Sequence, residues 1–162
     1  MIQVFASEHI LFVRPTERLV PDYLAMVNDI ENVRRFIAMK RSTQPIPEEK
    51  ERQWVRQKLE ENAPVFSMLE KDTGAFIGNI EFMDVADGVA ELGIAITAAM
   101  QDRGCGTEAI LAMVRYGMDT LGLHRVFLRV YPDNARAIHV YEKCGFREYD
   151  RTDDDVFMEI TR

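Results

Sequence analysis

Hydrophobic residues recur along the chain with two different periods, and each period predicts one kind of secondary structure. Between residues 21 and 62, apolar positions recur every three or four residues, which is the spacing of helices that pack one face against a core. From residue 65 the pattern changes to that of strands, which are separated by short Asp- and Gly-containing turns at residues 72–74 and 87–88. Three strands joined by such short turns predict an antiparallel meander.

The predicted helices carry recognisable signals at their ends. A break around residues 28–32 divides the first helical segment into one helix or two, and Pro47 begins a later helix that has Trp54 on its apolar side. Gly145 readily adopts a left-handed backbone and suits the end of a short helix. The apolar stripe of a further helix consists of Ile110, Met113, Val114, Gly117 and Leu121. The predicted helices cover residues 21–40, residues 47–62, the segment that contains the stripe from Ile110 to Leu121, and residues 134–144. A turn-rich loop at 42–47 precedes the second of them.

The predicted strands are residues 9–14, 65–70, 75–83, 89–96, 125–131, 146–149 and 156–160. A helix of the predicted length between strands 89–96 and 125–131 implies that these two strands are parallel. The pattern therefore predicts an α+β fold with a mixed sheet of about six to seven strands, an antiparallel meander and one parallel helical crossover. Because the 162 residues contain no repeat and no linker-like segment, we expect one domain over residues 1–162.

Composition excludes several classes of function. The 20 basic and 27 acidic residues give a net charge of −7, which repels nucleic acid and suits a cationic partner such as an amine, or simply favours solubility. The apolar runs are far shorter than the about 20 residues that a membrane span needs, and residues 1–15 lack a basic leader, so a cytoplasmic protein with no membrane partner is expected. Two cysteines and three histidines without metal-site spacing predict neither a disulfide framework nor a metal site.

The densest chemical signal is the glycine-containing segment of residues 101–109, between a predicted strand and a predicted helix. Glycines let a backbone approach a ligand, and the free amides of a helix start bind phosphate, although a plain turn also explains the composition. A nucleotide P-loop is excluded because no Gly-Lys-Ser/Thr follows. Gly104-x-Gly106-x-x-Ala109 with Asp133 fits a dinucleotide-binding pattern, but only 58 residues follow Gly104, and antiparallel strands precede it.

Two motifs in this part of the chain resemble those of the GCN5-related N-acetyltransferase (GNAT) superfamily. Gln101-x-x-Gly104-x-Gly106 is similar to the family's acetyl-CoA signature, and residues 134–146 are similar to its Asn-x-x-Ala-x-x-x-Tyr-x-x-x-Gly-Phe element. The segments that resemble the branch with the ribosomal-protein alanine acetyltransferases and many small-amine acetyltransferases are residues 12–15, 77–78 and 90–94. The resemblance implies a single-domain GNAT-like fold and a transferase that uses acetyl-CoA as co-substrate.

The resemblance also implies roles for individual residues in binding the cofactor. The loop at 102–107 would present main-chain amides to the pyrophosphate, with added positive charge from Arg103, and the strand at 94–96 would pair with the pantetheine arm. Asn134 would contact that arm, cap the helix that follows, or do both. The residues assigned to the cofactor are Ile94, Ala95, Ile96, Asp102, Arg103, Gly104, Cys105, Gly106, Thr107 and Asn134.

Catalysis is expected to involve direct attack of a neutral primary amine on the thioester. By resemblance, Tyr141 donates a proton to the departing thiolate, whereas a tyrosine on an amphipathic helix, taken without the family, is more often a core or boundary residue. Arg129 stands where the alanine acetyltransferases have a glutamate, so the base of that pattern is missing. Glu91 is the best remaining acid, with an ion pair or a solvated strand face as the alternative.

The acceptor is expected to be a protein amino terminus or a small amine. Because of the missing glutamate, a catalytically silent member of the fold that binds acyl-CoA as a sensor or partner protein is the alternative. A nucleotide-dependent oxidoreductase is a third hypothesis. Binding of CoA or of a nicotinamide nucleotide would separate the last hypothesis from the other two.

Overall fold

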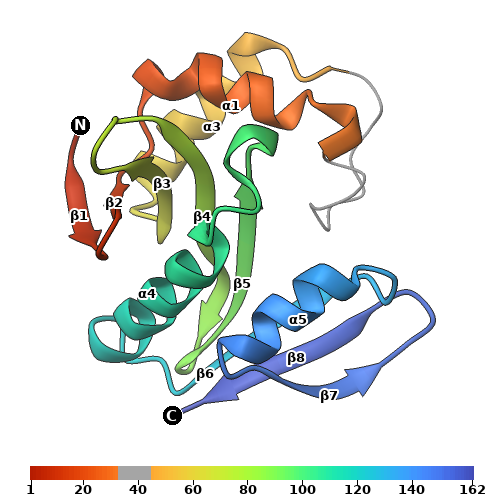
Figure 1. Ribbon diagram of the computed structural model, residues 1–162. Coiled ribbons are helices and arrows are strands. Elements are labelled where there is room, and N and C mark those ends of the chain that lie inside the picture. Colours follow the sequence, from red (N-terminus) through yellow and green to blue (C-terminus); the bar gives the residue numbers. More distant parts are fainter. Residues whose placement is uncertain (33–44) are drawn as a thin grey trace.

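Helices cover both faces of one mixed sheet in the computed structural model (Figure 1), which describes residues 1–32 and 45–162. The strands are β1 (Gln3–Ala6), β2 (Ile10–Val13), β3 (Val65–Glu70), β4 (Phe76–Ala86), β5 (Val89–Ile96), β6 (Arg125–Val130), β7 (Arg147–Arg151) and β8 (Val156–Thr161). The helices are α1 (Val20–Val27), α3 (Glu48–Glu60), α4 (Cys105–Asp119) and α5 (Ala135–Lys143), with short 3-10 turns η1 (Glu17–Leu19) and η2 (Ala98–Met100).

The described strands pair in the order β1-β2-β3-β4-β5-β6-β8-β7. All neighbours are antiparallel except β5 and β6, which α4 connects as a crossover. This parallel pairing is short, because it runs only from Val89 opposite Arg125 to Glu91 opposite Phe127 within the described residues. Beyond Glu91, β5 continues to Ile96 along β4 alone, so the edge of β5 that faces away from β4 is open.

The alternation of side chains along the strands divides the core into two parts. On one face, α4 and the strands enclose the larger cluster, in which Phe12, Ile80, Met113 and Leu128 are almost fully buried. On the other face, the smaller cluster lies under α1 and α3, where Tyr23 packs edge-on against Trp54 at 5.7 Å between ring centroids. Figure 1 shows α1 and α3 together at the top of the molecule, away from α4 and α5. The cofactor signatures therefore lie on the side of the sheet that carries α4 and α5.

Most predicted elements are confirmed, including the meander, the helical crossover and the helix end at Gly145, whose φ is 99°. The first helix ends at Val27, where the break was predicted, but the remainder of the segment predicted to be helical lies partly outside the described residues. Residues 42–44, half of the loop predicted at residues 42–47, also lie outside the described residues. No helix in the described part of the chain is long and apolar enough to cross a membrane.

Two details of the prediction are wrong. The described sheet has eight strands rather than six to seven, because β1 was not predicted. This strand has four residues and is mostly exposed, so it lacks a buried alternating pattern, and its main anchor is Phe5, which stacks on Phe12 and Tyr116. Leu121 was assigned to the stripe of α4, but the helix ends at Asp119 and the Leu121 side chain is exposed.

Gly78 of β4 lies in close contact with the main chain of β5. A Cβ atom added there would lie 1.9 Å from the Ala95 main-chain oxygen, so β5 would have to move. We expect Gly78→Ala to lower the free energy of unfolding by about 3 kcal/mol. This is the upper end of the usual cost of overpacking a core, and it applies here because the obstacle is backbone rather than a mobile side chain. Urea unfolding measures this change.

Gly74→Ala is the matched control for this substitution. Gly74 has a φ of 74° and no atom within 4 Å of an added Cβ, so only the backbone strain of about 1–2 kcal/mol applies. Equal losses of stability in the two variants would contradict a steric role of Gly78.

Candidate active site

A cavity of about 280 Å³ lies between the end of β5 and the helices α4 and α5. Both signature segments that the sequence analysis singled out contribute to its walls, although they are about 30 residues apart in the chain. The predicted cofactor residues that line it are Ile94, Ile96, Asp102, Gly104, Cys105, Gly106, Thr107 and Asn134, and Tyr141 joins them. The fold therefore brings nine of the twelve predicted site residues to one cavity, and leaves Ala95, Arg103 and Glu91 outside its lining.

The loop before α4 has the backbone shape of a helix start that is open to a ligand. Asp102 and Gly104 adopt left-handed conformations, with φ of 61° and 80°, and Gly104 is the N-cap of α4 without a side-chain cap. The main-chain amides in the first turn of a helix lack partners within the helix and attract anions. A Cβ atom added to Gly106 would touch only the end of the Ile96 side chain, at 3.4 Å, and would meet no other element within 4 Å, so this turn is open toward the cavity.

The open edge of β5 forms a second wall. The Thr97 amide donates to the Ile77 carbonyl of β4 at 2.9 Å, and alternate residues of a strand point their main-chain groups the same way. Ile94 and Ile96 therefore point their main-chain groups away from β4, toward the side where the pairing with β6 has ended. The side chain of Ala95 faces the opposite side and packs against the core under α1.

Helix α5 supplies the third wall. Asn134 accepts a hydrogen bond from the Ala137 amide at 3.2 Å, so it caps the helix, as one of the two predictions for this residue stated. The residue also lines the cavity. Tyr141 is partly buried at the cavity wall, and burial raises the pKa of its hydroxyl to about 12. At neutral pH the Tyr141 hydroxyl is therefore fully protonated and can act as a proton donor.

Charged residues at the rim of the cavity connect its walls. Arg136 of α5, which lines the cavity, forms an ion pair with Asp102 at 2.6 Å and so bridges α5 and the loop. Arg103 lies outside the lining, where its guanidinium is 3.6 Å from the Glu70 carboxylate. Arg136 and Lys143 were not predicted as site residues, although both lie in the second signature segment at positions that vary in the motif.

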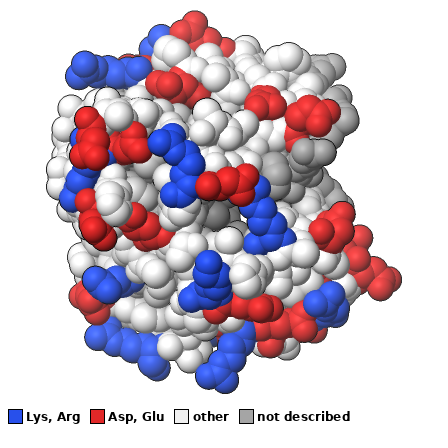
Figure 2. Space-filling model, in the orientation of Figure 1, with Lys and Arg blue, Asp and Glu red and all other residues white. Residues whose placement is uncertain are grey.

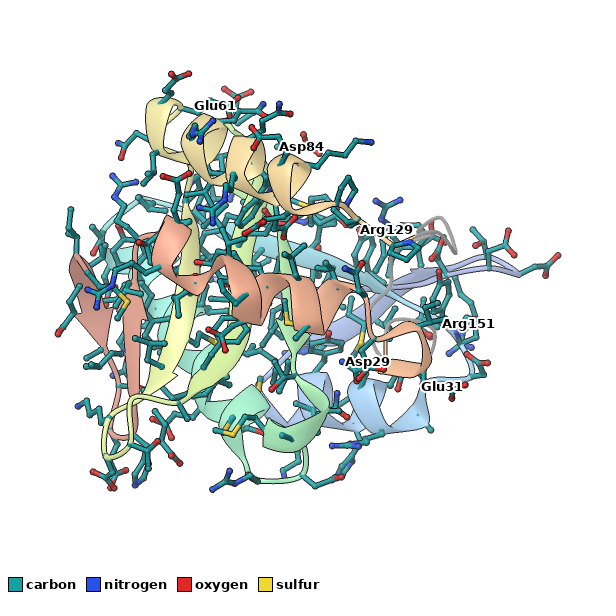
Figure 3. All side chains as sticks on the ribbon, turned by 90° about the horizontal axis from the view of Figure 1, so that it is seen from above. Asp29, Glu31, Glu61, Asp84, Arg129 and Arg151 are labelled. Carbon is teal, nitrogen blue, oxygen red and sulfur yellow. The ribbon has the colours of Figure 1, made fainter. Side chains whose placement is uncertain are left out.

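Glu91 is held in an ion pair on the other face of β5. Its carboxylate accepts a hydrogen bond from the Nε of Arg129 at 3.0 Å, and the residue is only 8% exposed. The pair raises the pKa of Arg129. Because side chains alternate along a strand, Glu91 projects to the face opposite Ile94 and Ile96. Figure 3 views the molecule from the side of α1 and α3 and labels Arg129.

The two cysteines near the cavity are thiols with raised pKa values. Burial raises the pKa of Cys105, which lines the cavity, and this outweighs the nearby charge of Arg103. Cys144 is buried, as predicted, and its sulfur donates to the Thr107 carbonyl at 3.8 Å. Neither thiol is activated as a nucleophile.

Glu108 fixes the first turn of α4 to the hairpin between β1 and β2. Its carboxylate accepts hydrogen bonds from the Ser7 hydroxyl at 2.5 Å and from the His9 amide at 2.7 Å. Burial acts to raise the pKa of Glu108, but these bonds and the His9 ring outweigh burial, so the pKa is lowered. The ionised carboxylate thus anchors the helix start that carries the loop.

Known proteins resemble this chain in sequence and in structure. Spermidine N(1)-acetyltransferase from Vibrio cholerae serotype O1 is 28% identical over 102 residues, which are 62% of this chain and 59% of that protein. The chain therefore spans less than two thirds of the length of this curated relative. A GNAT-family acetyltransferase from Bacillus anthracis superposes with a TM-score of 0.82 at 19% identity, over 99% of this chain and 98% of the other. Spermidine N-acetyltransferase from Vibrio cholerae, in complex with CoA and spermine, superposes with a TM-score of 0.81 at 20% identity, over 96% of both chains.

These superpositions establish the fold, which is a mixed sheet with one parallel pair and not the doubly wound parallel sheet of dinucleotide-binding domains. The family model for the acetyltransferase (GNAT) domain matches residues 9–147, which include both signature segments and the strand and helices that line the cavity, β5, α4 and α5. The match leaves out β1, β8 and most of β7. The chain belongs to the GNAT acetyltransferase family.

Proposed function

We propose that the protein is an acetyl-CoA-dependent N-acetyltransferase that moves an acetyl group to a primary amine by direct attack on the thioester. The observation that carries this proposal is the cavity itself, in which a ligand-accessible helix start, an open strand edge and a protonated tyrosine meet. Each of these features suits one part of acetyl-CoA. The family membership supports the same assignment.

The helix start of α4 suits the pyrophosphate of the cofactor. Main-chain amides of Gly104 to Thr107 would donate to phosphate oxygens, and the positive end of the helix dipole favours the negative charge. Arg136 neutralises the Asp102 carboxylate at the rim, which would otherwise repel an anion. The open edge at Ile94 and Ile96 would pair with the amide groups of the pantetheine arm, as one strand pairs with another.

The reaction needs two proton transfers, and we assign one residue to each. The amine must lose its proton before attack, and the CoA sulfur must gain one as the thioester bond breaks. Tyr141 would supply the proton to sulfur, because its raised pKa keeps the hydroxyl protonated. Glu91 is the proposed base, acting directly or through water from the other face of β5. Holding both reactants in one cleft in the right orientation would lower the activation barrier by a further roughly 7–11 kcal/mol.

The proposed acceptor is a protein amino terminus or a small amine. The names of the relatives include spermidine acetyltransferases, which favours small polyamines for the first acceptors to test. The net charge of −7 is compatible with a cationic acceptor. On the face shown in Figure 2, acidic and basic side chains are interspersed, so the attraction would be local to the acceptor site.

A catalytically silent CoA sensor is the second candidate function. The observation that favours it is the Glu91–Arg129 ion pair, which occupies the carboxylate that catalysis would need as a base. The two candidates share the cofactor and differ only in turnover.

CoA binding is tested by thermal unfolding with added ligand. A ligand that binds only the folded state at one hundred times its dissociation constant stabilises it by about 2.7 kcal/mol. We expect acetyl-CoA and CoA to raise the melting temperature and NAD and NADP to leave it unchanged. A shift with NAD or NADP and none with CoA would contradict the proposal.

The proposed base is tested by Glu91→Gln in single-turnover reactions with an identified acceptor. Loss of a general base costs about 100-fold or more, and the loss should be greatest at low pH, where most of the amine is protonated. The double variant Glu91→Gln/Arg129→Gln is the control, because it removes both charges of the pair. A wild-type rate in the double variant would show that Glu91 acts only by neutralising Arg129.

A further inference from the structure

A closed set of side-chain amide hydrogen bonds lies at the open edge of β5, on the carbonyl of Ile96. Asn32 is only 4% exposed, and its Nδ2 donates to the Ile96 carbonyl at 3.1 Å. The Nε2 of Gln101 donates to the same carbonyl at 3.1 Å and also to the Oδ1 of Asn32. Asn32 lies on the short segment after α1 that also carries Asp29 and Glu31, which Figure 3 labels.

This set of bonds joins the segment after α1 to the end of β5 and the loop before α4, whose bonded residues lie 64 and 69 residues further along the chain. The main-chain amide of Asn32 donates to the Oδ1 of Asp29 at 3.2 Å, which fixes the segment locally. The Asn32 side chain then reaches the end of β5 and the loop before α4. Ile96 and Gln101 line the cavity, whereas Asn32 does not. Any influence of Asn32 on a ligand in the cavity therefore acts through these two residues.

The bonds change which main-chain groups of β5 a ligand can use. A carbonyl oxygen has two lone pairs, and both acceptor positions of Ile96 are taken, by Asn32 and by Gln101. Among the contacts of residues 1–32 and 45–162, the outward-facing groups left for a ligand on this edge are the amide and carbonyl of Ile94 and the amide of Ile96. A peptide-like arm that lies along β5 thus has a single register in which its own donors and acceptors are matched.

We propose that Asn32 is a positioning residue for the pantetheine arm of CoA, which sets the register of that arm on β5 by occupying the Ile96 carbonyl. This inference rests on the proposed function, since it requires that the cavity binds CoA. Loss of the Asn32 side chain frees one lone pair of the Ile96 carbonyl and leaves the half-buried Gln101 side-chain amide with one partner fewer. The arm then meets an additional acceptor and a less firmly held strand end.

Asn28 offers a matched control on the same segment. Its side chain donates to the Ile46 carbonyl at 3.2 Å and accepts from the Ile46 amide at 2.7 Å, so it also bonds a distant main chain through both amide atoms. Neither Asn28 nor Ile46 lines the cavity. Asn28→Ala should therefore reproduce any general loosening of this part of the molecule without affecting the edge of β5.

The test compares the binding of CoA with that of 3′,5′-ADP, which has the 3′-phosphate and the first 5′-phosphate of CoA but neither its second 5′-phosphate nor its pantetheine arm. We expect Asn32→Ala to weaken CoA about tenfold, the value of one hydrogen bond of about 1.4 kcal/mol, and to change 3′,5′-ADP less than twofold. Asn28→Ala should leave both affinities unchanged. If Asn32→Ala does not fold, Asn32→Asp gives the same comparison, because it keeps the shape and the acceptor for Gln101 while removing the donor to Ile96.

The possible outcomes separate this inference from the proposed function. Unchanged CoA affinity in the folded Asn32 variant, or an equal loss for CoA and 3′,5′-ADP, would overturn the positioning role and leave the cofactor assignment intact. Failure of the wild-type protein to bind CoA would overturn both. With an identified acceptor, the positioning role further requires that Asn32→Ala raises KM for acetyl-CoA more than it lowers kcat.

Discussion

Gly106→Val should weaken CoA binding by a factor of about 100 or more while the protein stays folded. The valine side chain would occupy the space beside the first turn of α4, where the amides are expected to meet the pyrophosphate. Hydrogen bonds to charged groups contribute about 1.5–3 kcal/mol each, so losing two of them reduces affinity by about 10²–10⁴. The protein itself should tolerate the change, because an added Cβ at this position meets only the Ile96 side chain at 3.4 Å. Calorimetric titration with CoA measures the effect.

The control for this substitution is Leu111→Val on the exposed side of the same helix. It introduces the same branched side chain into α4, away from the cavity lining, and should leave CoA affinity unchanged. Circular dichroism establishes that both variants are folded. Unchanged CoA affinity in a folded Gly106→Val protein would remove the phosphate-loop hypothesis.

Tyr141→Phe should lower the rate of acetyl transfer about 100-fold with little change in CoA affinity. The substitution keeps the ring and its packing against Phe146, at 6.0 Å between centroids, but removes the hydroxyl proton. General-acid assistance contributes about 10²–10⁴ in rate, and the lower end applies here because a thiolate is already a good leaving group. Single-turnover measurements separate this chemical step from product release.

The pH dependence gives a second readout for Tyr141. The hydroxyl has to be protonated to act, and its pKa of about 12 keeps it protonated throughout the usual range. The wild-type rate should therefore rise with pH as the acceptor amine loses its proton, without a fall before about pH 11. Tyr149→Phe, at an exposed tyrosine of β7, is the control. A wild-type rate in Tyr141→Phe would show that catalysis rests on positioning alone.

The elements with strong local signals were predictable from the sequence. The turns with Asp and Gly at residues 72–74 and 87–88 define the meander, and Gly145 ends α5 as expected. Strand β1 could not be recognised, because it is short, exposed and held mainly by the rings of Phe12 and Tyr116 around Phe5. Contacts of this kind are tertiary and leave no periodic pattern in the chain.

The part of the cavity lining that belongs to the two signature motifs was predictable from the sequence. The motifs located the loop, Asn134 and Tyr141, and the structure brings them to one cavity. The sequence left Glu91 open between a base and an ion pair, and the pairing with Arg129 became visible only with the short parallel register of β5 and β6. Asn32 carried no signal, because an isolated polar residue in a predicted helix break does not reveal a bond to a strand 64 residues away.

Mass spectrometry of the acceptor tests the claim that this protein transfers acetyl groups from acetyl-CoA to amines. The wild-type protein is incubated with acetyl-CoA and a panel of polyamines, other small amines and peptides with free amino termini, and each acceptor is then weighed. We expect at least one amine to gain the mass of a single acetyl group, with release of one CoA for each acetyl transferred. CoA binding without acetylation of any amine in a broad panel would contradict the claim and would identify the protein as a CoA sensor.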